Sequence, residues 1–122
     1  MKHVLLVDDN PLNVNLARTI LTRAGHTVRT ANSAPEALAL LCESMPDVVV
    51  TDINMPGVTG TAMCRDLRTR FPASALRIVA YTALAMSDEL RAIESAGFDA
   101  IVVKPATKEA LLNAVCAPPT AS

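Results

Sequence analysis

The stretch that decides the fold is VLLVDDNP, at residues 4–11. Its first four residues form a short apolar run, which is typical of a strand buried on both faces. Asn10 and Pro11 are typical of a helix start, because an asparagine side chain can cap free backbone amides and proline fits the first helical turn. A buried strand followed at once by a helix predicts the first unit of an α/β fold.

The same alternation continues along the chain. Short β-branched runs recur between amphipathic stretches, so we expect a parallel sheet covered by helices on both faces. The expected strands are Val4–Val7, Thr27–Thr30, Val48–Thr51, Arg77–Tyr81 and Ala100–Val103. The start signals of five helices are Pro11 after Asn10, Ser33 with Glu36, Thr59, Ser87 before Asp88 and Glu89, and Thr107 with Glu109. Gly25 and Gly97 stand where the first and fourth helices should end.

Length and composition restrict the class of protein. At 122 residues the chain is about one domain long, so we expect a single domain over residues 1–116 and a flexible tail over 117–122. Hydrophobic residues make up 51% of the chain in short runs, which predicts neither disorder nor membrane insertion. The first residues lack the features of a secretory signal, so we expect a cytoplasmic location. A net charge of −1, with mixed signs along the chain, predicts no direct nucleic-acid binding.

Several conspicuous side chains are assigned no chemistry. The cysteines are odd in number and lack metal-ligand spacing, so we expect reduced, packed thiols at Cys42, Cys64 and Cys116. His3 and His26 are isolated at segment edges, so we expect surface or structural roles. A basic cluster on the third helix is expected to form a solvated face: Arg65, Arg68 and Arg70.

Polar residues follow the expected strands at the points where the strands end. They are Asp8 and Asp9 after the first strand, Asp52 after the third, Thr82 after the fourth, and Lys104 with Pro105 after the fifth. The carboxyl ends of parallel strands meet at one edge of the sheet, where ligands bind. Two carboxylates about 4 Å apart repel by roughly 4 kcal/mol at an effective dielectric near 20, and one lysine does not neutralise three of them. Oxygen ligands without histidine or cysteine favour Mg²⁺ as the compensating ion, and Mn²⁺ could substitute.

This arrangement predicts phosphoryl chemistry. A carboxylate flanked by a metal ion and a lysine can attack phosphorus and form an aspartyl phosphate, and Asp52 is the candidate. Phosphoryl transfer needs mainly positioning and charge stabilisation, to which the Thr82 hydroxyl and the Lys104 ammonium group could contribute. We therefore expect Asp52 to be a phosphoacceptor.

From Val4 through about Val115 the chain resembles bacterial response regulator receiver domains. The residues that carry the resemblance are VDDN at 7–10, DINMPG at 52–57 with Gly60, YTA at 81–83, AG at 96–97 and VKP at 103–105. The resemblance implies a doubly wound, flavodoxin-like fold with strand order 2-1-3-4-5 and five helices. It also implies a phosphorylation-activated switch in a two-component system or phosphorelay.

The resemblance further implies a role for each site residue. Asp8 and Asp9 would hold Mg²⁺ with Asp52 and the backbone carbonyl of Asn54. Asp52 would accept the phosphoryl group from a phosphohistidine donor. The groups that bind the phosphoryl oxygens or leave access to them would be Thr82, Ala83 and Lys104. The implied switch or structural positions are Pro56, Gly57, Ile101 and Pro105, with a cis bond between Lys104 and Pro105.

The implied partners are a sensor histidine kinase or histidine phosphotransfer protein, and a downstream effector protein or attached domain. The output face would consist of the fourth helix, the fifth strand and the fifth helix. No turnover of an external substrate is expected. No effector segment follows the fifth helix, so we expect either a stand-alone regulator or a receiver excised from a larger protein.

Two positions depart from the receiver pattern. Many receivers have an aromatic residue three positions before the lysine, whose inward turn couples phosphorylation to the output face. This chain has Ile101, which has no ring to swing over Thr82, so that coupling is called into question. Tyr81 does not replace it, because adjacent strand residues point to opposite faces and Tyr81 should enter a helix-packed layer. Thr59 replaces a frequent acidic residue, which costs little if it caps the third helix.

Three other functions compete with the phosphoacceptor reading. A nucleotide-binding module would need a glycine-rich loop after the first strand, where this chain has acidic residues and Pro11. An aspartate-based phosphatase would need a general acid two residues after Asp52, where this chain has Asn54. A receiver-like interaction module that does not depend on phosphorylation remains open because of Ile101. The complete set of acceptor residues favours phosphorylation.

Overall fold

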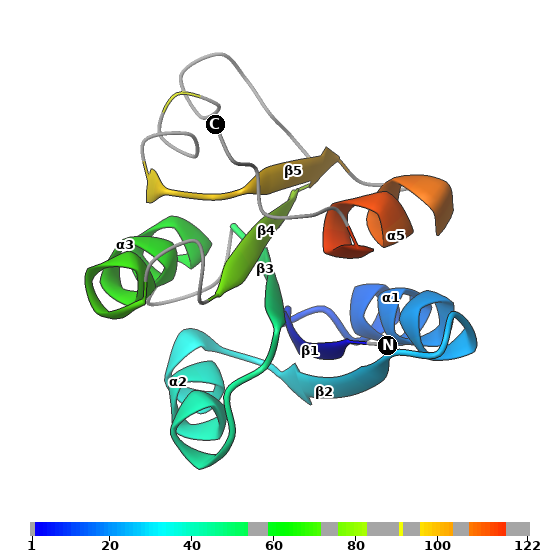
Figure 1. The fold of residues 1–122 in the computed structure, drawn as a ribbon, viewed down its shortest axis with the longest axis horizontal. Helices are drawn as coiled ribbons and strands as arrows, with labels where there is room; N and C mark the ends of the chain where they lie inside the picture. The colour runs from blue at the N-terminus through cyan, green and yellow to red at the C-terminus, as the bar shows by residue number, and fades with distance from the viewer. Residues whose placement is uncertain are drawn as a thin grey trace.

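The computed structural model of the chain describes residues 2–53, 59–71, 76–82, 91, 96–103 and 108–116. Its centre is a five-stranded parallel sheet with strand order β2-β1-β3-β4-β5 (Figure 1). The strands are β1 (His3–Val7), β2 (Thr27–Ala31), β3 (Val48–Asp52), β4 (Arg77–Thr82) and β5 (Ala100–Val103). The predicted parallel sheet and its strand order are therefore confirmed.

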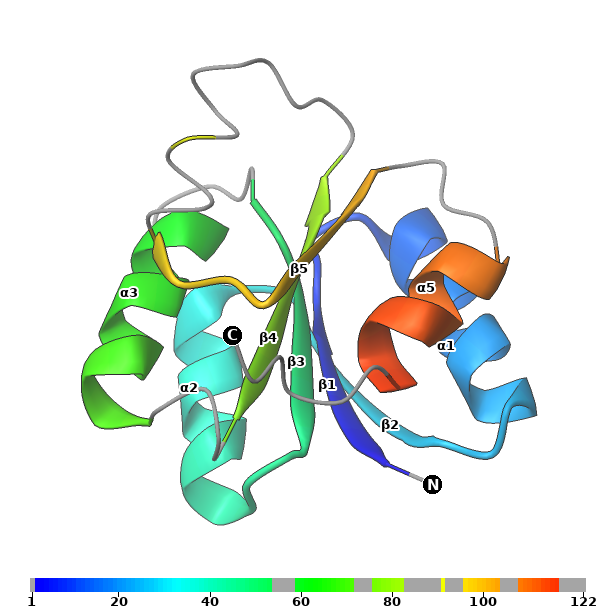
Figure 2. The same cartoon turned by 45° about the horizontal axis from the view of Figure 1, so that its top comes forward.

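Helices cover both faces of this sheet. They are α1 (Pro11–Arg23), α2 (Ala34–Glu43), α3 (Gly60–Arg70) and α5 (Lys108–Cys116). α1 and α5 lie on one face, and α2 and α3 lie on the other (Figure 2). Most of the expected fourth helix, including its start signal at Ser87, falls outside the described residues; of this stretch Arg91 and Ala96 are described, and both are helical.

Both faces of the sheet are buried, as the apolar runs predicted. Side chains alternate along β1, so that Leu5 and Val7 pack in the layer under α2 and α3 while Val4 and Leu6 pack under α1 and α5. All four are at most 1% exposed. Tyr81 packs in the α1 and α5 layer, which confirms the face predicted for it.

Side-chain caps begin the helices where the sequence signals stand. The Asn10 Oδ1 atom accepts a hydrogen bond from the Leu12 N–H at 3.0 Å, and the Thr59 hydroxyl accepts one from the Ala62 N–H at 3.2 Å. At α2 the Ser33 hydroxyl accepts from the Glu36 N–H at 3.3 Å. The Glu36 carboxylate accepts from the N–H of Asn32, one residue before the position that a capping box uses. Such caps each stabilise a helix by about 1 kcal/mol.

The end of α1 requires a glycine. Gly25 has a φ of 96°, its N–H donates to the Thr22 carbonyl, and the His26 N–H donates to the Leu21 carbonyl at 3.1 Å. This pair of bonds satisfies carbonyl groups that the last turn leaves free, and it needs a left-handed residue between them. The predicted end of the first helix is therefore confirmed.

Arginines satisfy the carboxyl ends of two other helices. Arg29 of β2 donates to the carbonyls of Leu40 and Ser44 at the end of α2, at 3.3 and 2.6 Å. Arg77, which is only 8% exposed, donates from Nε to the Ala114 carbonyl of α5 at 2.6 Å. Positive charge at a helix carboxyl end is favourable, so both side chains fasten a helix to the sheet.

The expectation of a solvated arginine face on α3 is wrong for one of its three members. Arg65 and Arg70 are exposed, but the Arg68 side chain is only 15% exposed and is bonded to three residues in two other segments. Among the described helices, none combines the length and the apolar content that crossing a membrane requires.

His26 has the structural role that the sequence suggested. It is 8% exposed, and its Nδ1 atom accepts a hydrogen bond from the Lys2 N–H at 3.1 Å. Burial lowers the pKa of His26 from its ordinary value of 6.5, and the positive charges of the N-terminus and Lys2 lower it further. As pH falls through about 6.5, the unfolded chain takes up a proton that the folded chain refuses. The free energy of unfolding therefore decreases until pH falls below the folded-state pKa.

We predict that this loss of stability depends on His26. Urea unfolding of the wild type and of His26→Gln, at about pH 7.5 and about pH 5.5, should show a larger decrease in the wild type, because glutamine does not titrate. His3→Gln, at an exposed position, is the control and should behave like the wild type. Equal decreases in the wild type and His26→Gln would contradict the prediction.

The expectation of packed thiols is confirmed for Cys64 and wrong for Cys42. Cys64 is fully buried, its Sγ atom donates to the Ala96 carbonyl at 3.4 Å, and burial raises its pKa to about 11. Cys42 is exposed. The side chain of Cys116 lies outside the description.

We predict that a maleimide at about pH 8 modifies Cys42 well before Cys64. At that pH roughly one Cys64 thiol in a thousand is ionised, and the thiolate is the reactive form. Peptide mass spectrometry of the native protein measures each site, with urea-unfolded protein as the control in which both react. Equal labelling of Cys42 and Cys64 in the native protein would refute the assignment.

Candidate metal centre

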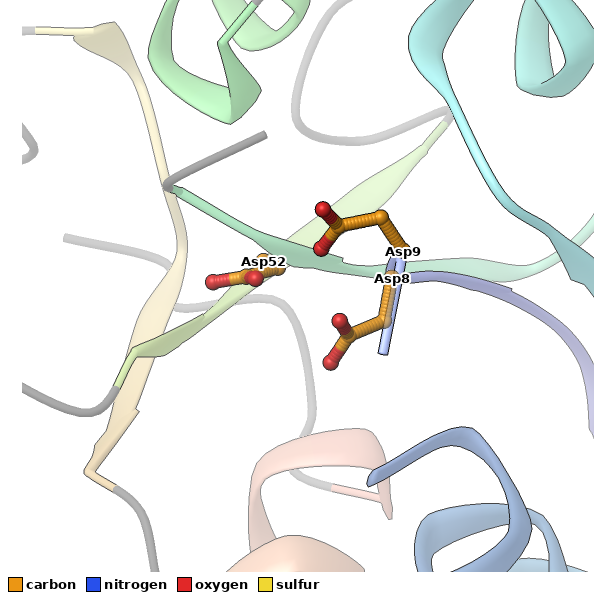
Figure 3. A group of neighbouring side chains, drawn as sticks. All are labelled: Asp8, Asp9 and Asp52. Carbon is orange, nitrogen blue, oxygen red and sulfur yellow. The ribbon is translucent and has the colours of Figure 1, made fainter. Parts of the chain in front are cut away.

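Two neighbouring strands deliver three carboxylates to the carboxyl edge of the sheet. Asp52 is the last residue of β3, and Asp8 and Asp9 directly follow β1. β1 and β3 pair with Val7 opposite Thr51, so Asp8 and Asp52 are the next residues on adjacent strands. One carboxylate oxygen from each of the three aspartates lies within 4.8 Å of the other two (Figure 3). The structure thus brings together the three acids that the sequence predicted to converge.

Local hydrogen bonds fix the direction of Asp8. Its N–H donates to the Ala31 carbonyl at 3.1 Å, which extends the contact of this segment with β2 by one residue. Its carboxylate Oδ1 accepts a bond from the Asn10 N–H at 2.9 Å. Asn10 in turn caps α1, so the turn that orients Asp8 also begins the first helix.

The backbone of Asp52 is held by close packing against α3. The Thr51 hydroxyl donates to the Asp52 carbonyl at 2.9 Å, and the Gly60 N–H donates to the Ile53 carbonyl at 3.0 Å. A Cβ atom added to Gly60 would lie 2.1 Å from the Asp52 carbonyl oxygen, so the first turn of α3 is pressed against the end of β3. Only glycine permits this approach.

Burial makes the acidic group costly without a counter-charge. Asp8 is 2% exposed and Asp52 is 8% exposed, whereas Asp9 is exposed. At these separations each pair of ionised carboxylates repels by roughly 3 to 4 kcal/mol at an effective dielectric near 20. The charge of Asp8 also reaches Tyr81, whose pKa is raised mainly by burial and further by this carboxylate.

The donor set fits a hard divalent cation. The group offers three carboxylate oxygens and contains no histidine or cysteine, which is the chemistry that Mg²⁺ prefers over zinc or copper. A groove of about 420 Å³ opens beside Asp8 and Asp9, on the side of the acidic group toward α1 and the end of β2. Its other lining residues come from α1 and the end of β2: Pro11, Val14, Asn15, Arg18, Thr30, Ala31 and Asn32.

The remaining predicted site residues are described only in part. Thr82 ends β4 and pairs with Val103, one residue beyond the Asp52–Tyr81 pair, so its backbone reaches the same edge; its side chain is not described. Ile101 lies half-buried in β5 opposite Ala80. Outside the described residues lie Asn54, Pro56, Gly57, Ala83, Lys104 and Pro105.

Sequence reasoning missed two contacts near the site. Gly60 was noted only as part of a motif, yet it is the residue that lets α3 reach Asp52. Arg68 was placed on a solvated face, although the buried stripe of α3 contained a signal: Gly60, Met63, Cys64 and Leu67 are buried, and position 68 is four residues after Cys64. A charged residue next to a buried stripe is itself largely buried, and buried charges are usually paired, so this position favours an ion pair with a buried partner.

Comparisons with a family model and with known proteins point to the same family. A family model described as the response regulator receiver domain matches residues 4–116. Over 105 residues the chain is 35% identical to the polar-differentiation response regulator DivK of Brucella anthropi, covering 85% of each protein. The chain is 34% identical over 108 residues to the sensor histidine kinase RcsC of Salmonella typhi. This alignment covers 88% of this chain but 11% of that protein.

Solved structures agree in fold. The chemotaxis protein CheY4 of Vibrio cholerae superposes with a TM-score of 0.85 at 30% identity, over 93% of this chain and 94% of that one. The receiver domain of a signal transduction histidine kinase from Syntrophus aciditrophicus gives the same TM-score at 25% identity, over 94% and 87%.

We predict that Asp9→Asn stabilises the metal-free protein and weakens Mg²⁺ binding. The exposed Asp9 carboxylate adds repulsion, so its removal in EDTA should raise the free energy of unfolding by about 1 kcal/mol. The dissociation constant for Mg²⁺ should rise about tenfold, because one anionic ligand is lost. Urea unfolding in EDTA and over a Mg²⁺ series measures both quantities.

Asp66→Asn is the matched control, because Asp66 is a half-exposed carboxylate on α3 outside the acidic group. It should leave the Mg²⁺ dependence of stability unchanged. An Asp9→Asn protein that Mg²⁺ stabilises as much as it stabilises the wild type would refute the metal assignment.

Proposed function

The chain belongs to the response regulator receiver domain family, and from this membership we propose that it is a phosphorylation-dependent signalling switch whose phosphoacceptor is the carboxylate of Asp52. The observation that carries the proposal is the meeting of Asp8, Asp9 and Asp52 within 4.8 Å at the carboxyl ends of β1 and β3. The backbone of Asp52 is packed against the first turn of α3, which suits a nucleophile that must keep its position.

The proposed step transfers a phosphoryl group from a phosphohistidine donor. A carboxylate oxygen of Asp52 attacks phosphorus, the phosphorus–nitrogen bond breaks, and its electron pair returns to the imidazole, which takes up a proton from water. The products are an acyl phosphate on Asp52 and a neutral histidine. In this proposal Thr82 and Lys104 bind phosphoryl oxygens, and the small Ala83 leaves access to them.

Asp8, Asp9 and Asp52 would hold Mg²⁺, together with the backbone carbonyl of Asn54. When bound, Mg²⁺ would supply positive charge that offsets the carboxylates and the transferred oxygens. Two of these ligands have well-defined surroundings: the Asn10 N–H orients Asp8, and Asp9 is exposed and lines the groove. The exposed Asp9 carboxylate supports the approach of Mg²⁺ from the solvent.

The proposal includes partners and an output. The donor is a sensor histidine kinase or a histidine phosphotransfer protein, and the chain lies in the cytoplasm. Phosphorylation would change the charge at Asp52 and bias two conformations of the face that contains β5 and α5. The receiver would comprise residues 1–116, with 117–122 as a flexible tail. Receiver domains are signalling modules. In this proposal the domain assists its own phosphorylation and dephosphorylation and turns over no external substrate.

A receiver-like interaction module that does not depend on phosphorylation is the second candidate. Ile101 favours it, because this β-branched residue stands half-buried in β5 where many receivers place a mobile aromatic ring. The complete acidic group favours the phosphorylated switch, since an interaction module has no need of three crowded carboxylates.

Intact-mass spectrometry with acetyl phosphate tests the proposal. In Mg²⁺ the wild type should gain the mass of one phosphoryl group, and in EDTA it should gain almost none. Asp52→Asn should remain unmodified under both conditions. Asp66→Asn, which alters a half-exposed carboxylate of α3, should be modified like the wild type.

Two outcomes would overturn the proposal. A wild type that stays unmodified in Mg²⁺ and in the presence of a phosphohistidine donor would favour the interaction module. An Asp52→Asn protein that is modified as fully as the wild type would place the phosphoacceptor elsewhere.

A further inference from the structure

We propose that α3 mechanically couples Asp52 to the entrance of β5, and that Arg68 is the positioning residue at the far end of this connection. The inference rests on the proposed phosphorylation of Asp52. It assigns to α3 the transmission that an aromatic residue at position 101 would otherwise provide. The two ends of α3 carry the argument.

The first end of α3 contacts the phosphoacceptor directly. Gly60 lies so close to the Asp52 carbonyl that an added Cβ atom would be 2.1 Å from its oxygen, and the Gly60 N–H donates to the Ile53 carbonyl at 3.0 Å. α3 and the end of β3 are therefore in direct van der Waals contact at this point. A shift of the backbone at Asp52 or Ile53 therefore displaces the first turn of α3, since packed interiors transmit small displacements.

The second end of α3 holds the segment that leads into β5. The Arg68 guanidinium donates from Nε to the Gly97 carbonyl at 2.8 Å and from Nη1 to the Leu76 carbonyl at 2.6 Å, and its Nη2 pairs with the Asp99 carboxylate. One side chain thus joins α3 to the residue before β4 and to two residues before β5. Figure 1 shows α3 beside the start of β5.

Further contacts fasten this junction. The same Asp99 carboxylate oxygen accepts a bond from the Ile78 N–H at 2.8 Å, and the Asp99 N–H donates to the Ile78 carbonyl at 2.8 Å. A Cβ atom at Gly97 would lie 2.8 Å from the Arg68 Cγ atom, so the Arg68 stem is packed against this glycine. The Cys64 thiol adds a bond to the Ala96 carbonyl.

The geometry makes α3 suitable as a rigid connection. Its 11 residues span about 16 Å, and its buried stripe of Met63, Cys64 and Leu67 is fixed in the core. β5 begins directly after Asp99, so the anchored junction lies at the start of the strand that contributes to the proposed output face. A displacement that starts at Asp52 therefore arrives at β5 without passing through residue 101.

Backbone NMR of the full chain tests this connection. Acetyl phosphate and Mg²⁺ should shift the amide signals of residues 97–103 in the wild type. In Arg68→Met these phosphorylation-induced shifts should shrink about threefold or more, while the mass gain at Asp52 stays near the wild-type level. Arg65→Met and Arg70→Met are matched controls, because both side chains are exposed on the same helix, and they should keep the wild-type shifts.

A merely structural role for Arg68 would give a different result. Arg68→Met would then lower stability and leave the phosphorylation-induced shifts at their wild-type size, which would overturn the inference. If Arg68→Met does not fold, Arg68→Lys replaces it: lysine keeps the charge but lacks the planar fork that makes three directed bonds, and the shifts should again shrink. Full shifts in Arg68→Lys would likewise overturn the inference.

The two proposals can fail separately. A wild type that gains no mass at Asp52 refutes the proposed function. A wild type that gains mass while residues 97–103 show no signal change, or an Arg68 variant with undiminished shifts, refutes only the coupling through α3.

Discussion

The crowding of three carboxylates at the ends of two adjacent strands is the constraint on which the rest of this structure depends. β3 is buried along all five of its residues, so it has no solvent face on which a polar group could stand. Chemistry is possible only where the strand stops. At that point Asp52 meets Asp8 and Asp9, and their mutual repulsion makes the site sensitive to any charge that arrives or leaves. A cation lowers the repulsion, and a phosphoryl group changes it again. The fold therefore gathers three mutually repelling carboxylates at one edge of its sheet.

The elements around this point hold it in place. The turn after β1 orients Asp8 through the Asn10 N–H and uses the same Asn10 side chain to begin α1. The first turn of α3 is packed against the backbone of Asp52. The starts of α1 and α3 thus each serve both the fold and the site. The arginines have a comparable double use: Arg29 and Arg77 fasten helices to the sheet, and Arg68 fastens two strand entrances to one helix.

The sequence predicted the parts that depend on local chemistry and on periodicity. The apolar runs predicted all five strands, each to within one residue at either end, and the caps at Asn10, Ser33 and Thr59 predicted three helix starts. The acids converged because strand direction determines where their side chains emerge. The sequence could not predict contacts that depend on how helices lie against the sheet. Arg68 looks solvated in a one-dimensional pattern, and its partners Leu76, Gly97 and Asp99 are distant along the chain. The same limit applies to Gly60, whose neighbour Asp52 belongs to another element, and to Cys42, which faces outward from a helix with a well-formed buried stripe.

The close approach of Gly60 to Asp52 also affects how genetic data on this protein should be interpreted. Position 60 tolerates no side chain, because even a methyl group would overlap the Asp52 carbonyl. In a saturation mutagenesis screen every substitution there should score as inactive, in the same class as substitutions of the reactive acids. The cause would be steric exclusion, because Gly60 has no side chain that could take part in phosphoryl transfer. A screen that ranks residues by phenotype alone would therefore count a packing requirement as a functional group.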